Sequence, residues 1–145
     1  MAIRITLADL TYTNQGIPSV SVPLGAGLVA SYAKKKLGDK IEYELFKYPQ
    51  DLKNYVENKN PKFVCFTNYS WTFDISYQFA RKIKEKFPNT IVVFGGPNYP
   101  NEVFTQKIFL TDYPAIDFHI KGEGETAFVD LFQNLEQLNF DVEAF

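Results

Sequence analysis

Short apolar runs alternate along the chain with longer segments in which apolar residues recur every three to four positions. The short runs cover residues 3–8, 41–46, 63–67, 91–94 and 116–120, and most are rich in β-branched or aromatic side chains. Runs of this length and composition predict strands. Three of them are apolar almost throughout, which is typical of strands that helices cover on both faces.

The segments between these runs have the periodicity of helices. Gly38 is expected to cap the first helix, and Pro88 is expected to end the third. The apolar positions of the five helices are Leu24, Leu28, Tyr32 and Leu37; Leu52, Tyr55 and Val56; Ile75, Phe79, Ile83 and Phe87; Val103, Phe104 and Ile108; and Phe128, Leu131, Phe132, Leu135 and Leu138. Strict alternation of strands and helices predicts an α/β, doubly wound five-stranded parallel sheet with helices on both faces. Five such units fit the flavodoxin-like strand order 2-1-3-4-5.

Length and composition indicate one ordinary globular domain that spans residues 1–145. Aromatic residues make up 17% of the chain, which favours a core of large side chains. The formal net charge of −2 argues against nucleic acid as a partner. The sequence shows neither a membrane-spanning run nor the pattern of a signal peptide, so we expect a cytoplasmic domain.

The chain has a single cysteine, which excludes an internal disulfide and an all-cysteine metal site. Cys65 lies within the apolar run 63–66 and is expected to pack as a small buried side chain. The cationic run 34–36 ends the first predicted helix, where it favours the negative end of the helix dipole.

Polar or glycine-rich segments follow four of the predicted strands, at the edge where doubly wound sheets bind ligands. They are Asp9 to Gly16, Asn68 to Thr72, Gly95 to Pro100 and Lys121 to Glu125. Two adjacent glycines at the end of an apolar strand allow a flat ligand to lie directly on the backbone. Gly25 to Gly27 provide small residues of the same kind near the start of the first helix.

Each of these segments also has a purely structural interpretation. Ser70 or Thr72 is a candidate cap for the third helix. Glu125 suits the positive end of the fifth helix, and Gly95 with Gly96 suits a tight turn before proline. One segment alone is a weak signal, whereas their convergence at one sheet edge favours a binding site.

The paired motifs Gly95-Gly96-Pro97 and Gly122-Glu123-Gly124-Glu125, with Pro23-Leu24-Gly25 at the first helix, resemble the N-terminal B12-binding domain of B12-dependent radical-SAM proteins. The resemblance covers about residues 3–138. It implies a cobalamin across the strand ends, with its nucleotide tail inserted beside the sheet. The residues expected to contact it are Asp9, Thr11, Tyr12, Thr13, Thr67, Asn68, Ser70, Trp71, Gly95, Gly96, Pro97, Gly122, Glu123, Gly124 and Glu125. A valine at Gly96 is expected to block the tail and leave the domain folded.

The chain departs from related cobalamin domains in two ways. Mutases and methionine synthases carry Asp-x-His-x-x-Gly after the first strand, whereas this chain has Thr11 in place of the histidine and Asn14 in place of the glycine. The resemblance therefore implies base-off cobalamin without a protein histidine ligand. The three-cysteine motif that binds a [4Fe-4S] cluster is excluded by the cysteine count. We expect the N-terminal part of a longer enzyme, which the apolar ending 140–145 also favours.

The parent enzyme implied by the resemblance is a radical-SAM protein, most commonly a methyltransferase. Its barrel domain would be the partner of this chain and would use a [4Fe-4S] cluster and S-adenosylmethionine. The isolated chain is expected to catalyse nothing.

Two other functions fit parts of the pattern. Thr11 to Gly16 resembles the phosphate loop of a flavin mononucleotide (FMN)-binding flavodoxin, but residues 17–22 separate it from the first helix. Asp9 and Lys121 lie near positions that a receiver-like signalling domain uses. A receiver requires an aspartate at the end of the third strand, where Thr67 and Asn68 stand instead.

His119 is the only histidine and hence the obvious candidate for a cobalt ligand. In the order 2-1-3-4-5, its strand lies three steps from the first, or roughly 14 Å at ordinary strand spacing. We therefore expect His119 to be partly buried, hydrogen-bonded to a neighbour and not bound to cobalt.

Overall fold

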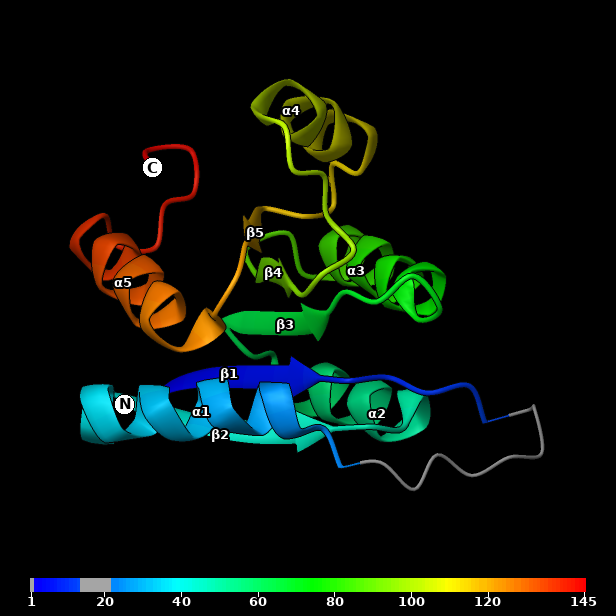
Figure 1. Cartoon of the computed structure of the whole chain (residues 1–145). Coiled ribbons are helices and arrows are strands. Elements are labelled where there is room, and N and C mark those ends of the chain that lie inside the picture. The colour runs from blue at the N-terminus through cyan, green and yellow to red at the C-terminus, as the bar shows by residue number, and fades with distance from the viewer. Residues whose placement is uncertain (1, 14–21) are drawn as a thin grey trace.

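The computed structural model describes residues 2–13 and 22–145, and these form a five-stranded parallel sheet in the order β2-β1-β3-β4-β5 (Figure 1). The strands are β1 (Ile3–Ala8), β2 (Ile41–Phe46), β3 (Phe63–Thr67), β4 (Ile91–Gly95) and β5 (Phe118–Ile120). The helices are α1 (Leu24–Leu37), α2 (Pro49–Lys59), α3 (Phe73–Lys86), α4 (Val103–Asp112) and α5 (Gly124–Gln137), with a 3-10 turn η1 (Gly38–Lys40) after α1. The predicted fold class and strand order are confirmed.

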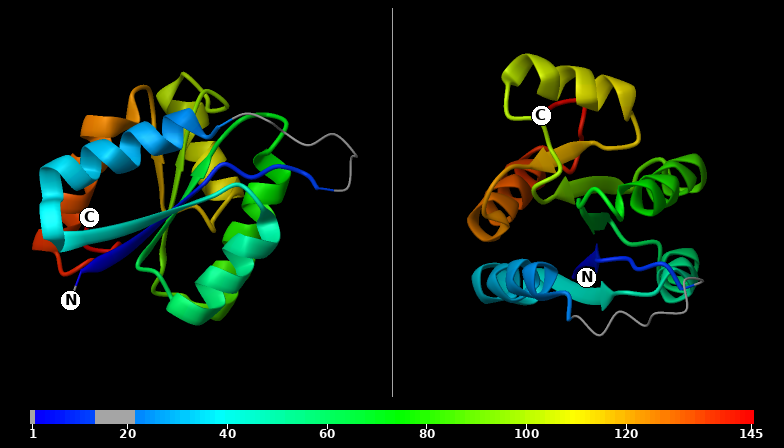
Figure 2. Two further views of the ribbon diagram at one scale, coloured as in Figure 1. Left: turned by 90° about the horizontal axis from the view of Figure 1, so that it is seen from below. Right: turned by 45° about the vertical axis from the view of Figure 1, so that its right-hand side comes forward.

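Helices cover both faces of the sheet, α1 and α5 on one side and α2 and α3 on the other (Figures 1 and 2). Alternate residues of each central strand face opposite layers. On β3, Phe63 and Cys65 pack in the core with α1 and α5, whereas Val64 and Phe66 pack in the core with α2 and α3. Both cores need apolar residues, which explains the nearly continuous apolar runs.

The ends of α1 and α3 follow from local chemistry. Gly38 has a φ of 58° and donates its backbone N–H to the Lys34 carbonyl, so the predicted C-terminal cap of α1 is confirmed. The Lys34 ammonium donates to the carbonyls of Gly38 and Ile41, both at 2.9 Å. Helix α3 ends two residues before Pro88. Its N-cap residue, Thr72, makes no side-chain capping bond.

Strand β5 is shorter than the apolar run predicts. Residues 116–120 were expected to form it, but the ladder begins only at Phe118. The Asp117 carboxylate accepts hydrogen bonds from the Val92 backbone N–H at 2.7 Å and from the Lys84 ammonium at 2.8 Å. Ile116 is buried in the core with α2 and α3. Asp117 thus bonds Val92 through its carboxylate and through its backbone N–H, which donates to the Val92 carbonyl at 3.0 Å, one residue before β5 begins.

Helix α4 lies beyond β5 at one edge of the sheet, and none of its described residues is fully buried (Figures 1 and 2). Aromatic contacts from Phe109 and Tyr113 to Phe73 join it to α3, with ring centroids 5.7 and 4.8 Å apart. After α5, Phe140 packs on Phe63 of the central strand β3 with ring centroids 5.8 Å apart. No helix among the described residues is long and apolar enough to cross a membrane.

Candidate functional site

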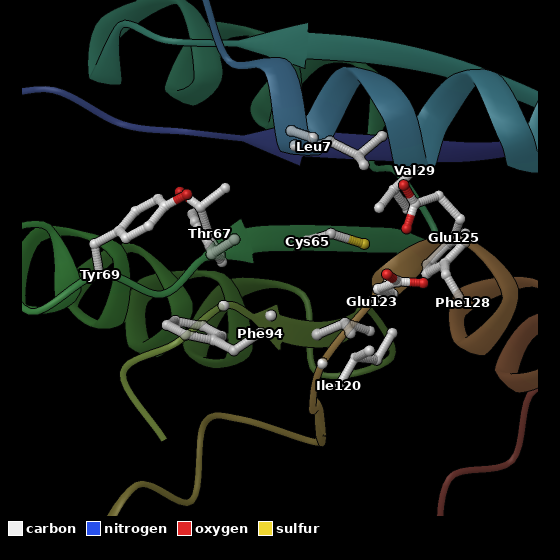
Figure 3. Close-up of a pocket in the computed structure, with 18 residues that line it drawn as sticks. Leu7, Val29, Cys65, Thr67, Tyr69, Phe94, Ile120, Glu123, Glu125 and Phe128 are labelled. Atoms are coloured by element: carbon white, nitrogen blue, oxygen red, sulfur yellow. The ribbon is translucent and has the colours of Figure 1, made fainter. Parts of the chain in front are cut away.

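A cavity of about 270 Å³ lies between the sheet and helices α1 and α5, on the carboxyl side of the strands (Figure 3). We call it the slot. Leu7 of β1, Cys65 of β3 and Val93 of β4 line the slot from the sheet. Because these residues occupy equivalent positions on neighbouring strands, they give the slot an apolar floor on one face of the sheet.

Small residues form much of the slot's walls. Helix α1 contributes Gly25, Ala26 and Val29, and α5 contributes Gly124 and Phe128. A Cβ atom at Gly124 would lie 2.9 Å from Val29 Cγ2, so a side chain there would press on Val29 in the wall of the slot. A Cβ atom at Gly25 would meet nothing within 4 Å. The wall at Gly25 therefore leaves open space beside the apolar floor.

The charges beside the slot are negative. Figure 3 shows the carboxylates of Glu123 and Glu125 next to the cavity, near the start of α5. Among the described residues that line the slot there is no lysine or arginine. Burial raises the pKa of the Cys65 thiol, so Cys65 stays a neutral side chain in the floor. The slot therefore favours a ligand that is uncharged where it enters.

The loop after β1 is attached to the neighbouring strands. The Thr67 hydroxyl donates to an Asp9 carboxylate oxygen at 2.6 Å, which joins the ends of β1 and β3. The Thr11 N–H donates to the Lys47 carbonyl at 3.1 Å. Tyr12 is half-buried beside Thr11. This loop lies at the switch point, where the chain leaves β1 in one direction and β3 in the other.

The loop after β3 carries a stacked aromatic pair. The rings of Tyr69 and Trp71 lie 4.9 Å apart and within 9° of parallel. Tyr69 lines the slot, whereas the Trp71 side chain is 69% exposed. The Thr72 hydroxyl donates to the Tyr69 carbonyl at 3.4 Å, which closes the turn. A large aromatic face is thus presented to solvent at the strand ends.

Asn68 joins the loops after β3 and β4. Its side chain is fully buried, and its amide donates to the Asn98 carbonyl at 2.6 Å. The same amide group lies 3.0 Å from His119 Nε2, and Asn68 Oδ1 accepts from the Asn98 amide at 3.0 Å. We call Asn68, Asn98 and His119 the asparagine node.

The expectation that His119 is partly buried and hydrogen-bonded to a neighbour is confirmed. Its ring stacks on Tyr99 with centroids 3.7 Å apart, and its Nε2 faces the Asn68 amide. Its buried Nδ1 has no hydrogen bond of standard geometry to any described residue. Burial lowers the pKa of His119 to about 4, although an interaction with the Ile120 backbone opposes this shift. The imidazole is therefore neutral at pH 7.

The structure brings about half of the predicted site residues into the slot. Seven of them line it: Thr67, Gly95, Gly96, Gly122, Glu123, Gly124 and Glu125. Asp9, Thr11, Tyr12, Thr13, Asn68, Ser70, Trp71 and Pro97 lie in the same strand-end loops but do not line it. Asn14, compared above with the glycine of the mutase motif, and Gly16, compared with the flavodoxin phosphate loop, lie outside the described residues.

Sequence reasoning missed the apolar residues of the slot. Leu7, Val93 and Phe128 were assigned only to strands and a helix, and Cys65 only to packing. A usable signal exists in their spacing, because residues two apart on a strand share a face. Leu7 is the last residue of β1 that faces α1 and α5, whereas Cys65 and Val93 each lie two residues before the ends of their strands, Thr67 and Gly95, on the same face.

Comparison with solved structures supports the fold. A cobalamin-binding protein from Desulfitobacterium hafniense DCB-2 superposes with a TM-score of 0.63 over 91% of this chain and 58% of that one. The two sequences are 14% identical. At this identity the likeness concerns the architecture alone.

Comparison of sequences defines the family. The model of the B12 binding domain matches residues 15–132, so the chain belongs to the B12-binding domain family. It is 33% identical over 115 residues to 2-(S-pantetheinyl)-carbapenam-3-carboxylate methyltransferase of Streptantibioticus cattleyicolor. It is 32% identical over 115 residues to the cobalamin-dependent radical SAM methyltransferase TokK of Streptomyces tokunonensis. Each match covers 76% of this chain but only 16% of the relative.

A third relative is an uncharacterized methyltransferase, PH0819, of Pyrococcus horikoshii. It is 28% identical over 119 residues, which cover 79% of this chain and 25% of the relative. The chain thus corresponds to between a sixth and a quarter of the length of these methyltransferases. The predicted resemblance to the B12-binding domain is confirmed.

Proposed function

We propose that this chain binds cobalamin across the carboxyl ends of its strands, in the base-off form, with the nucleotide tail in the slot. The observation that carries the proposal is the slot itself, an apolar space with small-residue walls beside the sheet. It lies beside the sheet, where the resemblance to B12-binding domains implies the tail. Membership of the B12-binding domain family supports the choice of cobalamin over other flat ligands.

The residues of the slot fit the lower part of cobalamin. The tail ends in dimethylbenzimidazole, a flat bicyclic ring that is largely apolar. Leu7, Cys65 and Val93 offer it an apolar floor, and the wall at Gly25 leaves open space beside that floor. Burying such a ring against apolar side chains is favourable at about 25 cal/mol per Å².

The loops around the slot fit the corrin. The corrin ring carries amide side chains on its rim, which require hydrogen-bonding partners, and a broad flat face. Asp9 and Thr67 supply polar groups at the switch point, while Trp71 supplies an exposed aromatic surface. Aromatic side chains pack favourably on flat apolar surfaces. When bound, cobalamin supplies a redox-active cobalt ion.

We propose further that cobalt receives no histidine from this chain. Thr11 stands at the position of the histidine in other cobalamin domains, and threonine is a poor ligand for cobalt. His119 belongs to the edge strand β5, where its ring stacks on Tyr99 and its Nε2 is hydrogen-bonded to the Asn68 amide. Both observations favour a lower face left to water or to no ligand.

The charge of the slot disfavours FMN. Its phosphate is a dianion, and it usually binds to backbone N–H groups at a helix start or to cationic side chains. Here Glu123 and Glu125 lie beside the cavity. A receiver function is disfavoured because β3 ends at Thr67, followed by the buried Asn68. Cobalamin is the ligand that the geometry supports best.

The relatives suggest the context in which the domain works. One is named as a methyltransferase of a carbapenam carboxylate, and another as a cobalamin-dependent radical SAM methyltransferase. Both extend far beyond the matched segment. We propose that this chain is the cobalamin domain of a B12-dependent radical-SAM enzyme of the methyltransferase type. The [4Fe-4S] cluster and S-adenosylmethionine would be bound by its barrel domain, and the isolated chain would turn over no substrate.

The proposal is tested by co-elution of the purified chain with ligand in gel filtration. The chain is mixed with hydroxocobalamin or with FMN, and the visible absorbance of the protein peak is measured. We expect one cobalamin per chain and no FMN. A colourless protein peak with cobalamin, or a yellow one with FMN, would contradict the proposed function.

A further inference from the structure

The asparagine node satisfies every polar group of Asn68. The backbone N–H of Asn68 donates to the Gly95 carbonyl at 2.7 Å, and its carbonyl accepts from the Asn98 N–H at 3.1 Å. Its side-chain amide faces the Asn98 carbonyl and His119 Nε2, and its Oδ1 accepts from the Asn98 amide. Asn68 therefore has neither a free donor nor exposed surface with which to contact a ligand.

The neutral imidazole of His119 completes this arrangement. Both hydrogens of the Asn68 amide are directed outward, one to the Asn98 carbonyl and one to Nε2, so Nε2 must act as an acceptor. The proton of the neutral ring then resides on Nδ1. Stacking on Tyr99 holds the ring in the orientation that this bond requires.

The loop after β4 lies directly on the backbone of Asn68. Gly96 has a φ of 138°, and a Cβ atom there would lie 2.7 Å from the Asn68 carbonyl oxygen. Only glycine combines this conformation with so close an approach. The loops after β3 and β4 are thus fixed to each other at Asn68, three residues before Trp71.

We propose that Asn68 is a positioning residue, which, held by His119 and Asn98, fixes the Tyr69–Trp71 pair in the orientation that receives the corrin. This inference rests on the proposed function. Asn68 acts through the loop that it anchors, because its own groups are all occupied. Loss of one bond in the node should loosen the loop and weaken cobalamin binding while the rest of the domain stays folded.

The experiment uses the fluorescence of Trp71, the only tryptophan of the chain. Corrin absorbs where tryptophan emits, so a bound corrin close to Trp71 quenches it. Titration with hydroxocobalamin gives Kd from the shape of the curve. The residual emission at saturation reports how close Trp71 lies to the bound corrin. All variants are compared at a temperature where each is folded by circular dichroism.

The key variants change the acceptor at His119. In His119→Leu a buried donor of Asn68 has no partner, and we expect Kd to rise about tenfold or more, with higher residual emission. In His119→Gln an amide oxygen can replace Nε2, and we expect Kd within about threefold of the parent. Asn98→Ala removes only the bond to Asn68 Oδ1 and serves as the second variant if His119→Leu does not fold.

Val56→Ala is the matched control for stability. Val56 is buried in the last turns of α2, whose final residue, Lys59, accepts a hydrogen bond from Arg4 near the start of β1. It therefore lies far from the carboxyl ends of the strands. We expect this variant to be less stable and to bind cobalamin with unchanged Kd and quenching. If His119→Leu and Asn98→Ala match the parent in both readouts, the positioning role is refuted and the proposed function stands. If the parent itself does not bind cobalamin, both are refuted.

Discussion

Substitution of Cys65 by phenylalanine should separate ligand binding from stability. Figure 3 shows the thiol of Cys65 directed into the slot from the centre of its floor. A phenyl ring in its place would occupy space that the proposed function assigns to the nucleotide tail. Because the cavity measures about 270 Å³, the ring can enter it without displacing the neighbouring strands.

The magnitude follows from the area that the tail would bury. A bicyclic aromatic ring buries about 150 Å² or more, and at about 25 cal/mol per Å² its exclusion costs about 4 kcal/mol of binding free energy. About 4 kcal/mol corresponds to roughly a thousandfold in Kd. We expect Cys65→Phe to weaken cobalamin binding by about 100-fold to 1000-fold. Its free energy of unfolding should stay within about 1 kcal/mol of the parent.

Cys65→Ala is the matched control, because it enlarges the slot. Removal of the sulfur from the core should lower the free energy of unfolding by about 1–2 kcal/mol and leave Kd within about threefold. Kd is measured by titration with hydroxocobalamin and stability by urea unfolding. Tight binding by a folded Cys65→Phe variant would refute the placement of the tail in the slot.

Three further outcomes follow from the structure. Cobinamide lacks the nucleotide tail, so the parent chain should bind it at least about 50-fold more weakly than it binds cobalamin. The parent and Cys65→Phe should bind cobinamide with about the same Kd, and titration of both proteins with both ligands would show this. In urea unfolding, Gly96→Ala should lose about 2–4 kcal/mol because its Cβ collides with the Asn68 backbone, whereas Gly25→Ala should lose nothing and gain up to about 1 kcal/mol. The folded-state pKa of His119, about 4, lies below the ordinary 6.5, so the unfolded chain takes up this proton first. The free energy of unfolding of the parent should therefore fall by about 2 kcal/mol as the pH is lowered from 6.5 to 4, after allowance for the partial exposure of His119. The fall should be smaller in His119→Gln, because glutamine does not titrate.

The fold could be predicted because its pattern is repeated in every unit. Strands such as 63–67 are apolar on both faces, and the ends of α1 and α3 carry Gly38 and Pro88, whose effects are local. The start of β5 could not be predicted, because Asp117 lies within the run 116–120. Its carboxylate accepts a hydrogen bond from the Val92 backbone N–H. Such a bond depends on Lys84 and Val92, which are distant in sequence.

The site could be predicted only as far as its loops. Glycines and polar residues after each strand indicate a binding edge, but the role of each depends on three-dimensional contacts. The expectation that a valine at Gly96 would leave the domain folded is wrong, because its Cβ atom would lie 2.7 Å from the backbone carbonyl oxygen of Asn68. Substitutions there test the fold, whereas substitutions at Cys65 test the slot.

The central claim is that cobalamin binds with its tail detached from cobalt and without a nitrogen ligand from the chain. The electron spin resonance spectrum of bound cob(II)alamin tests both parts, because one axial nitrogen splits each cobalt line into three. Free cob(II)alamin shows this splitting from its own benzimidazole at neutral pH. We expect the splitting to disappear in the complex with the parent chain and to be equally absent with His119→Ala. A triplet that persists in both complexes would show that the tail stays on cobalt, and a triplet that disappears only in His119→Ala would show that His119 is the ligand.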